Sequence, residues 1–477
     1  MVRRETLMMG SFLALLLALA ACSSDSNGDG PRGEAEAWLT TGDAQARLSA
    51  QPALPFRDGT PAQGLRIILD PDAQFQTMYG FGAALTHASA HVIHHAPSRD
   101  DIIRQLFSPV DGIGISYVRL AMGASDFVAR DPYTYADVPA GESDPDLTSF
   151  SIQPDREAII PVLQDAVALN PSIRLMGSPW SAPAWMKTSG VLQGGRLLTQ
   201  FYPSYAEYFV RFIEEYAAEG LSIDAVTVQN EPEHETSSYP TMRMEPAAQA
   251  AFVGSHLGPA LEERAPETRL LIWDHNWDMP AYPMTVLGDP TARAFVDGVA
   301  WHCYGGNVDA QGPVHAAHPD KEAYFTECSG GTWDENFASV LTWNMQNLFI
   351  GSVRQHASVV LLWNLALDPQ HGPHRGGCDT CRGVVTVATN GTVTREPEYY
   401  VIGHFSRFVL PGARRIGSNS FPGELENVAF RNADGSFVLV VMNPTAEPRG
   451  FDVVAGGGHF TYSNLPPRSV VTLRWDG

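Results

Sequence analysis

The stretch "IDAVTVQNEPEHETSSYP", residues 223–240, begins as a run of mostly apolar and β-branched residues and then turns polar. Such a run is typical of a buried strand, and the residues that follow it occupy the carboxyl end of that strand. Asn230 and Glu231 stand at this end, and Pro232 restricts the backbone directly after them. A carboxylate in this position indicates a catalytic site when the end of another strand places a second carboxylate near it.

Eight short apolar runs lie between residues 76 and 390, and each ends in polar or aromatic residues. Helical patterns separate them, which is typical of a parallel sheet that is buried on both faces. Eight such units predict an α/β fold, the (β/α)8 TIM barrel, whose reactive residues cluster at the carboxyl ends of the strands. The predicted strands are 78–85, 115–122, 173–180, 224–231, 269–276, 296–304, 323–328 and 358–367.

Residues 203–220, "PSYAEYFVRFIEEYAAEG", predict one of the helices between these strands. Ser204 and Glu207 have the spacing of a capping box, in which each side chain satisfies a backbone N–H group at the helix start. The aromatic residues repeat at the helical period, so we assign them to the core rather than to a sugar-binding surface. Gly220 suits the position just past the helix end.

The seventh predicted strand leads into "KEAYFTECSGG", residues 321–331, and it places a second carboxylate, Glu327, at a strand end. Strands four and seven lie across the mouth of an eight-stranded barrel, so Glu231 and Glu327 can point into one cleft. Hydrolysis of a glycosidic bond typically uses two carboxyl groups. One protonates the leaving oxygen, and the other attacks the anomeric carbon or activates water. The two groups need opposite protonation states, so their surroundings must separate the two pKa values.

Eight motifs follow one another in the sequence: "MYGFGAALTHASA", "YVRLAMGASDF", "LMGSPWSAPAWMKTSG", "AVTVQNEP", "VAWHCYGG", "YFTECSGG", "LLWNLALDPQHGP" and "YYVIGHFSRFVLPGARRIGS". By these motifs the sequence, from about residue 76 to the C-terminus, resembles glycoside hydrolase family 30, which includes lysosomal glucosylceramidase and the bacterial and fungal β-1,6-glucanases. The resemblance implies a barrel fused to a β-sandwich that is built from both chain ends. It implies retaining hydrolysis of β-glucosides, most simply of a β-1,6-glucan. The alternatives are a glucosylceramidase-type exo-β-glucosidase and a non-catalytic lipoprotein that binds glycans at the cell surface.

By this resemblance Glu231 corresponds to the general acid/base and Glu327 to the nucleophile. A retaining mechanism predicts carboxyl groups about 5–5.5 Å apart. Arg119 corresponds to an arginine that contacts the catalytic carboxylates, and its charge would keep Glu327 ionised. Asn230 corresponds to the asparagine that hydrogen-bonds the sugar 2-OH. The other expected substrate contacts are Trp180, Tyr304, Trp363, His87 and His302.

Some positions depart from the glucosylceramidase pattern. The resemblance implies an aspartate that binds sugar hydroxyls where this sequence has His87, which can form hydrogen bonds but supplies no bidentate carboxylate. Cys303 stands where glucosylceramidase has a tryptophan. The segment "HGPHRGGCDTCRGVV", residues 371–385, is closer to the bacterial β-1,6-glucanases. The sequence leaves the choice between endo and exo action open.

Further candidates lie beside the strand ends. Residues 233–235 follow Glu231, and we expect them to shape the leaving-group side of the cleft rather than to bind a metal. In "WDHNWD", residues 273–278, His275 or Trp277 could contact the substrate.

The first 22 residues predict a lipoprotein signal peptide. Arg3 and Arg4 precede an apolar run that is short for a membrane span, and the run Leu19-Ala20-Ala21-Cys22 resembles a bacterial lipobox, in which Cys22 is lipidated. Residues 23–35 predict a flexible tether. We therefore expect an exported bacterial lipoprotein that is membrane-anchored and faces the periplasm or the cell exterior. The alternative is plain signal cleavage beside an incidental cysteine.

The rest of the chain predicts how the two domains are divided. Short alternating runs broken by turn residues fill residues 395–477, which is a β-sandwich pattern. Residues 36–75 contain one more strand, "GLRIILDPDAQ" at 64–74, which can join the same sandwich. The barrel is therefore expected over residues 76–394.

Charge and cysteine content narrow the partners and cofactors. The 53 acidic and 31 basic residues give a formal net charge of −22, which would repel a phosphate backbone, so we expect no nucleic-acid partner. Cys378 and Cys381 predict a small-loop disulfide or free thiols. A zinc site with His371 and His374 is disfavoured, because hydrolysis by two carboxylates requires no metal. We expect no cofactor, no metal and a monomer.

Overall fold

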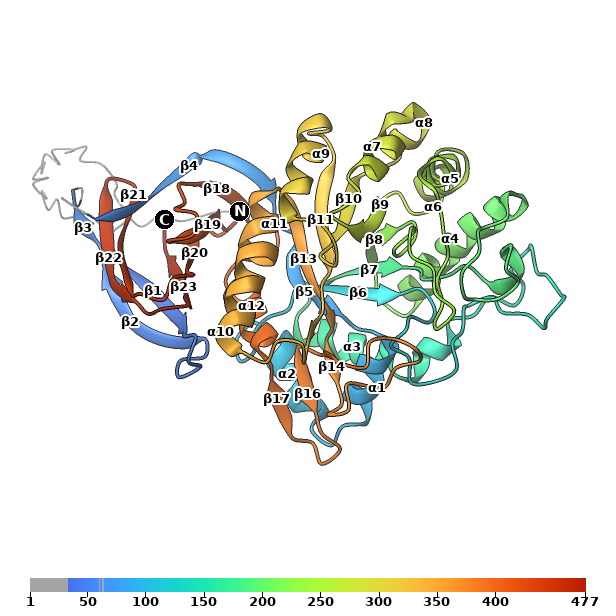
Figure 1. Cartoon of the computed structure of the whole chain (residues 1–477), viewed down its shortest axis with the longest axis horizontal. Coiled ribbons are helices and arrows are strands. Elements are labelled where there is room, and N and C mark those ends of the chain that lie inside the picture. The colour runs from blue at the N-terminus through green and yellow to red at the C-terminus, as the bar shows by residue number, and fades with distance from the viewer. Residues whose placement is uncertain (1–32, 60, 62–63) are drawn as a thin grey trace, which may run out of the picture.

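Each of the eight predicted runs forms a strand, and together the strands close into a parallel barrel in chain order (Figure 1). The last strand pairs with the first, Val359 lying opposite Gly80. The computed structural model describes residues 33–59, 61 and 64–477. The barrel strands are β5 (Gly80–Ala84), β6 (Tyr117–Ala121), β7 (Arg174–Ser178), β8 (Ile223–Thr227), β9 (Arg269–Asn276), β10 (Gly298–His302), β11 (Glu322–Glu327) and β13 (Ala357–Asn364).

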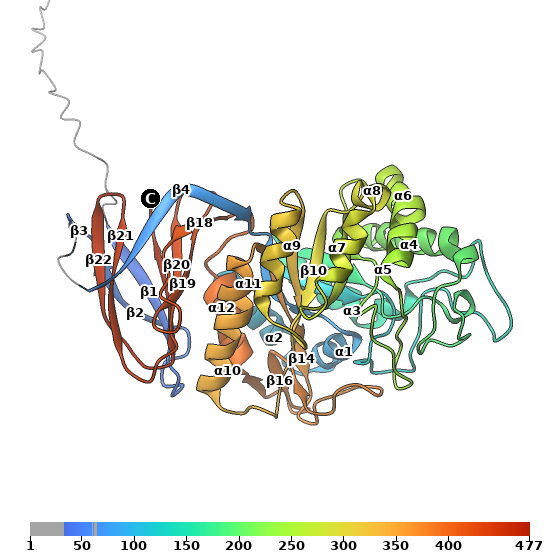
Figure 2. The same cartoon turned by 45° about the horizontal axis from the view of Figure 1, so that its top comes forward.

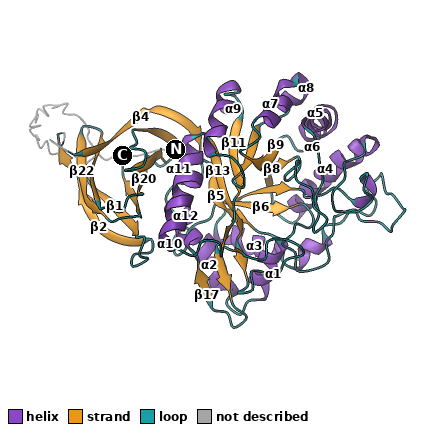
Figure 3. Cartoon of the chain, viewed as in Figure 1, coloured by secondary structure: helices purple, strands orange, loops and turns teal. Residues whose placement is uncertain are grey.

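Helices surround the outside of the barrel (Figure 3), and side chains fill its interior. Because the interior is packed, substrate can reach only the loops at the mouth. Two short π-helical segments, Val253–Leu257 and Asn344–Phe349, join α5 to α6 and α10 to α11. The helices are α1 (His87–His95), α2 (Arg99–Phe107), α3 (Ile159–Leu169), α4 (Tyr202–Ala218), α5 (Pro246–Phe252), α6 (Gly258–Arg264), α7 (Ala281–Gly288), α8 (Pro290–Arg293), α9 (Gln311–Ala317), α10 (Phe337–Trp343), α11 (Ile350–Arg354) and α12 (Pro397–Ser406).

Helix α4 is the core helix that the aromatic pattern predicts, but its predicted start is wrong. The helix begins at Tyr202, and Pro203 in its first turn fixes a helical backbone before Ser204 is reached. The Ser204 hydroxyl therefore donates to the carbonyl of Pro145 (2.8 Å) instead of capping the helix. Glu207 pairs with Arg211 and Arg264 on the surface.

The second domain is a β-sandwich to which both chain ends contribute. The N-terminal strand β1 lies between β2 and the C-terminal strand β23, and β4 lies between β18 and β21. The fold predicted from the sequence is thereby confirmed. The N-terminal strands are β1 (Glu34–Thr40), β2 (Ser49–Pro55), β3 (Arg57–Asp58) and β4 (Leu65–Thr77). The C-terminal strands are β18 (Arg414–Ser418), β19 (Glu426–Arg431), β20 (Phe437–Asn443), β21 (Arg449–Ala455), β22 (Gly458–Leu465) and β23 (Ser469–Trp475).

The expected domain boundary at residue 395 precedes α12, and this helix belongs with the barrel. Its residues Val401, Ile402 and Phe405 are buried in the same hydrophobic core as Phe81 of β5. The apolar residues of α12 thus cover the outside of the barrel, and the C-terminal sandwich strands begin only at β18. In Figures 1 and 2, α10, α11 and α12 lie between the barrel strands and the sandwich.

The expected signal peptide, Cys22 and most of the expected tether lie outside the described residues. The tether was expected to reach residue 35, whereas β1 already begins at Glu34. Within the described part of the chain, no helix combines the length and the apolar character that a membrane span needs.

Candidate active site

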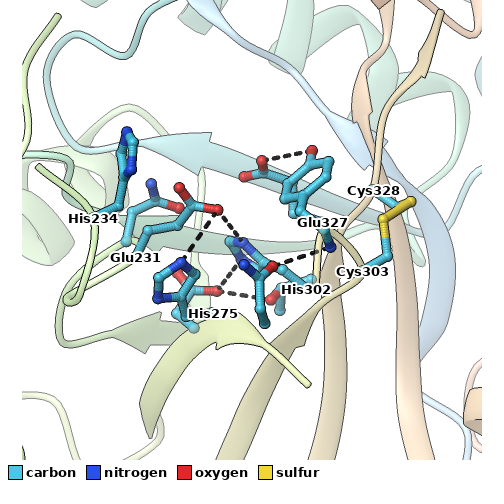
Figure 4. Close-up of polar contacts among 12 residues, drawn as sticks. Glu231, His234, His275, His302, Cys303, Glu327 and Cys328 are labelled. Carbon is cyan, nitrogen blue, oxygen red and sulfur yellow. Dashed lines mark hydrogen bonds and ion pairs between the residues drawn. A yellow bond between two sulfur atoms is a disulfide. The ribbon is translucent and has the colours of Figure 1, made fainter. Parts of the chain in front are cut away.

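The two glutamates meet at the carboxyl-terminal mouth of the barrel. Glu231 follows β8 and Glu327 ends β11, and both line a cleft of about 420 Å³. One carboxylate oxygen of each lies within 4.8 Å of the other, close to the separation of about 5–5.5 Å typical of a retaining pair. Figure 4 shows the two carboxylates pointing toward each other.

The backbone holds Glu231 in an uncommon conformation. Its φ is +47°, in the left-handed region, and Pro232 follows directly. The amide of Glu231 donates to the carbonyl of Asp274 (3.0 Å), and the amide of Asn230 donates to the carbonyl of Pro179 (2.8 Å). These two hydrogen bonds tie the end of β8 to both neighbouring strands. A strained backbone held from both sides is typical of a functional position.

A buried arginine organises the base of the cleft. The Arg119 guanidinium, on β6, donates to the Glu327 carboxylate and to the side-chain oxygen of Asn230 (2.7 Å). It also pairs with Asp274 (2.9 Å). Because Arg119 occupies the Asn230 oxygen, the amide NH2 of Asn230 is the group left to face the cleft. Arg119 thus contacts the carboxylate, as expected, but it lies beneath the cleft rather than in its lining.

Asp274 is a site residue that the sequence did not reveal. It lies inside β9, where Ala300 of β10 pairs with Trp273 and Trp301 pairs with His275, so Asp274 is the extra residue of a β-bulge. The bulge turns its carboxylate into the barrel, where it accepts hydrogen bonds from Thr227 and Thr326 (2.7 Å each). Despite burial, Arg119 and His302 hold the pKa of Asp274 far below its usual range. The one available signal was an acidic residue within an apolar strand.

His302 does not line the cleft as expected. It is fully buried at the end of β10, its Nδ1 lying 3.1 Å from Glu231 and its Nε2 3.0 Å from Asp274. With a carboxylate at each nitrogen, the imidazole fits the doubly protonated form, which donates at both. Burial acts against this charge, but Glu327, Asp274 and Glu231 outweigh it and raise the pKa of His302 to about 9.

The pKa values of the two glutamates are separated, as the chemistry requires, but in an unexpected direction. Burial opposes the charge on both residues. At Glu231 the hydrogen bond from His302 prevails and lowers the pKa, whereas at Glu327 burial and the nearby Glu231 prevail over His302 and Arg119 and raise it. The expectation that Arg119 would keep Glu327 ionised omitted the burial of this carboxyl group and the nearby charge of Glu231.

Aromatic residues form the walls of the cleft. Trp180 and Trp363 are stacked, with ring centroids 5.2 Å apart, and the Arg119 guanidinium lies 4.9 Å from the Trp180 ring. The Tyr304 hydroxyl donates to the second oxygen of Glu327 (2.9 Å). These three aromatic residues lie where the sequence predicted them. Such surfaces suit the apolar faces of a sugar ring.

His87 is a further correction, because it does not line the cleft. Its side chain is buried, its Nδ1 accepts a hydrogen bond from the amide of Ala129 (3.2 Å), and burial lowers its pKa to about 4. A carboxylate that does line the cleft is that of Asp126, which follows β6. Burial and Glu327 raise the pKa of Asp126 to about 8. A partly protonated carboxyl can both donate to and accept from sugar hydroxyls.

The cleft contains other residues that the sequence had left open or had not suggested. His275 lies 3.9 Å from Glu231 and lines the cleft, whereas Trp277 is buried and donates to Gln311. Of residues 233–235, only His234 is part of the lining. The lining residues that the sequence reasoning missed are Asp126, Phe127, Tyr239, Asn276, Ser329, Trp333, Cys378 and Cys381.

Two disulfides border the cleft. Cys378 is bonded to Cys381, so of the open alternatives the disulfide is the one observed, and the zinc hypothesis loses both thiolates. The second, Cys303–Cys328, was not predicted, and it lies beyond Glu327 as seen from Glu231 (Figure 4). The sequence did hold a signal for this disulfide. His302 and Glu327 pair across the neighbouring strands β10 and β11, and Cys303 and Cys328 directly follow these two residues.

Among the described residues, one group has metal-ligand spacing: Glu231, His302 and Glu327, with one atom of each within 4.8 Å of the others. Both nitrogens of His302 already face carboxylates, so this histidine is placed to hold protons. Hydrogen bonds and opposite charge account for the group without an ion.

A closed (β/α)8 barrel with two carboxylates at this separation across its mouth defines the class of O-glycoside hydrolases. Residues 78–409 match the family model described as the glycosyl hydrolase family 30 TIM-barrel domain, and residues 412–473 match that of the family 30 beta sandwich domain. The chain belongs to glycoside hydrolase family 30.

Similar proteins include endo-1,6-β-glucanases and glucosylceramidases. The endo-1,6-beta-D-glucanase neg1 of Aspergillus fumigatus is 35% identical over 83% of this chain and 84% of its own length. The lysosomal acid glucosylceramidase of Mus musculus is 32% identical over 88% of this chain and 84% of its own length. Among solved structures, the endo-beta1,6-glucanase BT3312 superposes with a TM-score of 0.86 at 33% identity, covering 93% of this chain and all of its own.

Proposed function

We propose that this protein is a retaining β-glucosidic hydrolase whose substrate is a β-1,6-glucan. The observation that carries the mechanism is the short separation of Glu231 and Glu327, with oxygens within 4.8 Å across one cleft. This distance leaves no room for a water molecule between the second carboxylate and the sugar, as inversion would require. The substrate assignment is supported by the endo-1,6-β-glucanases, which match this chain at 35% and 33% identity.

In the first step the Glu327 carboxylate attacks the anomeric carbon and forms a glycosyl ester. The bond to the leaving oxygen breaks, and that oxygen takes a proton from Glu231. In the second step Glu231 removes a proton from water, which attacks the same carbon and releases Glu327. The Asn230 amide is placed to hydrogen-bond the sugar, and Tyr304 is placed to hold the attacking oxygen of Glu327 in line.

We infer that the free protein stores the catalytic proton on His302. His302 Nδ1 and Glu231 Oε1 are 3.1 Å apart, so a proton transfer between them changes neither the total charge nor the atom positions appreciably. The transfer neutralises Glu231 and removes its repulsion of Glu327, but it also neutralises His302, whose charge lowers the pKa of Glu327, so Arg119 is then the charge that stabilises the Glu327 carboxylate. The reaction requires Glu231 to hold the proton for the leaving group while Glu327, paired with Arg119, is ionised.

Glucosylceramide is the second candidate substrate. It is supported by the mouse lysosomal glucosylceramidase, which is 32% identical over 88% of this chain. The two candidates share the glucose-binding part of the cleft and differ in what leaves with the glycosidic oxygen. Incubation of the purified protein with linear β-1,6-glucan and with glucosylceramide separates them directly.

The test of the mechanism is Glu327→Gly. Turnover of an aryl β-glucoside should fall on the order of 10³-fold or more, because the covalent intermediate cannot form. Azide should restore turnover and yield the α-glucosyl azide, since a small anion can occupy the space of the missing carboxylate. A correctly folded variant that azide does not rescue would contradict the role of Glu327. If the wild-type protein binds glucan without cleaving it, and Glu327→Gly binds glucan equally well, these results would instead support the glycan-binding alternative.

We also propose that the protein is exported, monomeric and anchored through a lipidated Cys22. The lipobox-like run Leu19–Cys22 supports the anchor. The disulfides Cys303–Cys328 and Cys378–Cys381 support the export, because such bonds persist in oxidising compartments. Cys22→Ser should move the protein from the membrane fraction to the soluble fraction. Retention of that variant in the membrane fraction would contradict the lipid anchor.

A further inference from the structure

A second cavity adjoins the cleft on the side of Glu327. Its volume is about 380 Å³, comparable to that of the cleft itself. Tyr304, Ser329 and Trp333 line both cavities, so the two spaces are continuous across these residues. None of the residues placed above in the reaction, apart from Tyr304, belongs to this side pocket.

The side pocket presents large aromatic surfaces to solvent. Trp333 is 61% exposed and Trp343, at the end of α10, is 45% exposed, whereas Trp180 and Trp363 in the cleft are at most 5% exposed. Exposed tryptophans are costly to leave in water unless a ligand covers them. Together the two indoles offer a platform that begins at the cleft and leads away from it.

The structure holds this platform in place before any ligand arrives. Strand β12 (Gly330–Gly331) pairs with β15 (Cys381–Arg382). The Arg382 guanidinium donates to the carbonyls of Gly331 and Asp334 (3.0 Å each), which flank Trp333. A side chain at Gly331 would collide with the Trp333 ring, with a Cβ atom only 1.9 Å from it. The indole therefore lies directly on the glycine backbone, and little order has to be gained on binding.

The charges of the side pocket favour a neutral, hydroxyl-rich ligand. Arg382 is paired with the buried Glu398 (2.8 Å), so neither charge is free for a ligand. The Asp334 carboxylate accepts from the amide of Asn336 (3.0 Å) and from the Ser339 hydroxyl (2.6 Å). Aromatic faces beside such polar groups match a sugar, which has apolar faces and a polar rim.

We propose that the side pocket is a binding subsite for further glucose units of the chain that occupies the catalytic cleft. The inference rests on the proposed function, because the cleft must hold a glucan for its neighbour to hold the next units. A 1,6-linkage has one more rotatable bond than linkages to ring carbons, so such a chain can bend from the cleft across Trp333 toward Trp343. The binding energy of these distant units then contributes to cleavage at the cleft.

The test is Trp343→Ala, compared with Trp343→Phe, on β-1,6-linked gluco-oligosaccharides of two to six units and on an aryl β-glucoside. The alanine variant should lose kcat/KM about fivefold to tenfold on the longer oligosaccharides, as expected for one lost stacking contact. It should match the wild-type protein on the aryl glucoside and the dimer. The phenylalanine variant should keep most of the activity, because it retains a ring.

Three results would overturn the subsite. The first is equal activity of Trp343→Ala and the wild-type protein at every length, and the second is an equal loss on all substrates, including the aryl glucoside. The third, with glucosylceramide added to the substrates, is a loss confined to that lipid, which would assign the side pocket to its acyl chain. In each of these cases the wild-type protein still cleaves its substrate, so the loss concerns the subsite alone. If the wild-type protein cleaves no β-1,6-gluco-oligosaccharide, the proposed function fails and the subsite fails with it.

Discussion

At the scale of single residues, the site is a balance of buried charges around Glu231 and Glu327. Two cations, Arg119 and His302, face three carboxylates, and Asp274 joins the cations to each other through both of its oxygens. Because the cluster is buried, each of its charges is worth more than it would be in water, and removal of one member shifts the pKa values of the others. Within this cluster, His302 is the member whose side chain hydrogen-bonds the Glu231 carboxylate.

The role of His302 as the proton store predicts the pH profile of His302→Gln. The basic limb of kcat/KM reports loss of the proton that the leaving group must receive. With the pKa of His302 raised to about 9, wild-type activity should persist to about that pH. In the variant only Glu231 can hold the proton, so the basic limb should move down by about one pH unit or more.

The matched control is His275→Gln. His275 also lies near Glu231, at 3.9 Å, but burial lowers its pKa to about 4, so it is uncharged where the basic limb lies. Its replacement should leave the position of the basic limb unchanged. A basic limb at the same pH in His302→Gln and in the wild-type protein would contradict the proton store, whatever the change in kcat.

At the scale of elements, the segment 371–385 forms one wall of the cleft. The amide of Arg375 donates to the carbonyl of Asp126 (2.7 Å), and the backbone of Gly377 lies so close to Asp126 that a Cβ atom would be 2.4 Å from its carboxylate. The Cys378–Cys381 disulfide follows immediately and leads into β15. The segment therefore contacts Asp126 twice, at its backbone carbonyl and at its carboxylate.

The double variant Cys378→Ser and Cys381→Ser should impair catalysis more than folding. A disulfide that closes so short a loop contributes only about 2 kcal/mol through chain entropy. Loosening the segment should nevertheless lower kcat/KM on β-1,6-glucan severalfold, because Asp126 loses its fixed position. Steady-state kinetics and a thermal melt measure the two effects. An unchanged kcat/KM would show that the loop keeps its place without the bond.

At the scale of the whole molecule, His404 joins the two domains. It lies on α12 against the barrel, and its two ring nitrogens lie 2.8 Å from the hydroxyls of Thr472 and Thr40, which belong to the paired C-terminal and N-terminal strands β23 and β1. The histidine is fully buried, and burial lowers its pKa to about 3. The neutral ring therefore stabilises the junction of three segments that are far apart in the sequence.

His404 predicts a loss of stability in acid. Between pH 6.5 and about 3 the unfolded chain binds a proton at this residue and the folded chain does not, so the free energy of unfolding falls as the pH falls through this range. His404→Gln should cost about 1–2 kcal/mol at pH 7 through poorer hydrogen bonds. It should also show a shallower decline toward pH 4. Urea unfolding at several pH values measures both, and equal slopes for variant and wild type would contradict the assignment.

Much of the fold could be predicted because it depends on local patterns. The eight strands, the core helix α4 and the sandwich strands follow from alternation and helical period, which neighbouring residues determine. The role of Ser204 and the place of α12 could not be predicted, because each depends on a contact with another part of the chain. Ser204 binds the Pro145 carbonyl, and α12 covers the barrel.

The sequence by itself determined the barrel, the sandwich, and the delivery of Glu231 and Glu327 to strand ends that face one mouth. Only the tertiary structure decided what surrounds them: Asp274 turned inward by a bulge, His302 between two carboxylates, and Asp126, not His87, in the lining of the cleft. The physical reason is that a strand end fixes where a residue lies. Its charge, its proton and its access to substrate depend on groups that other strands bring within a few ångströms.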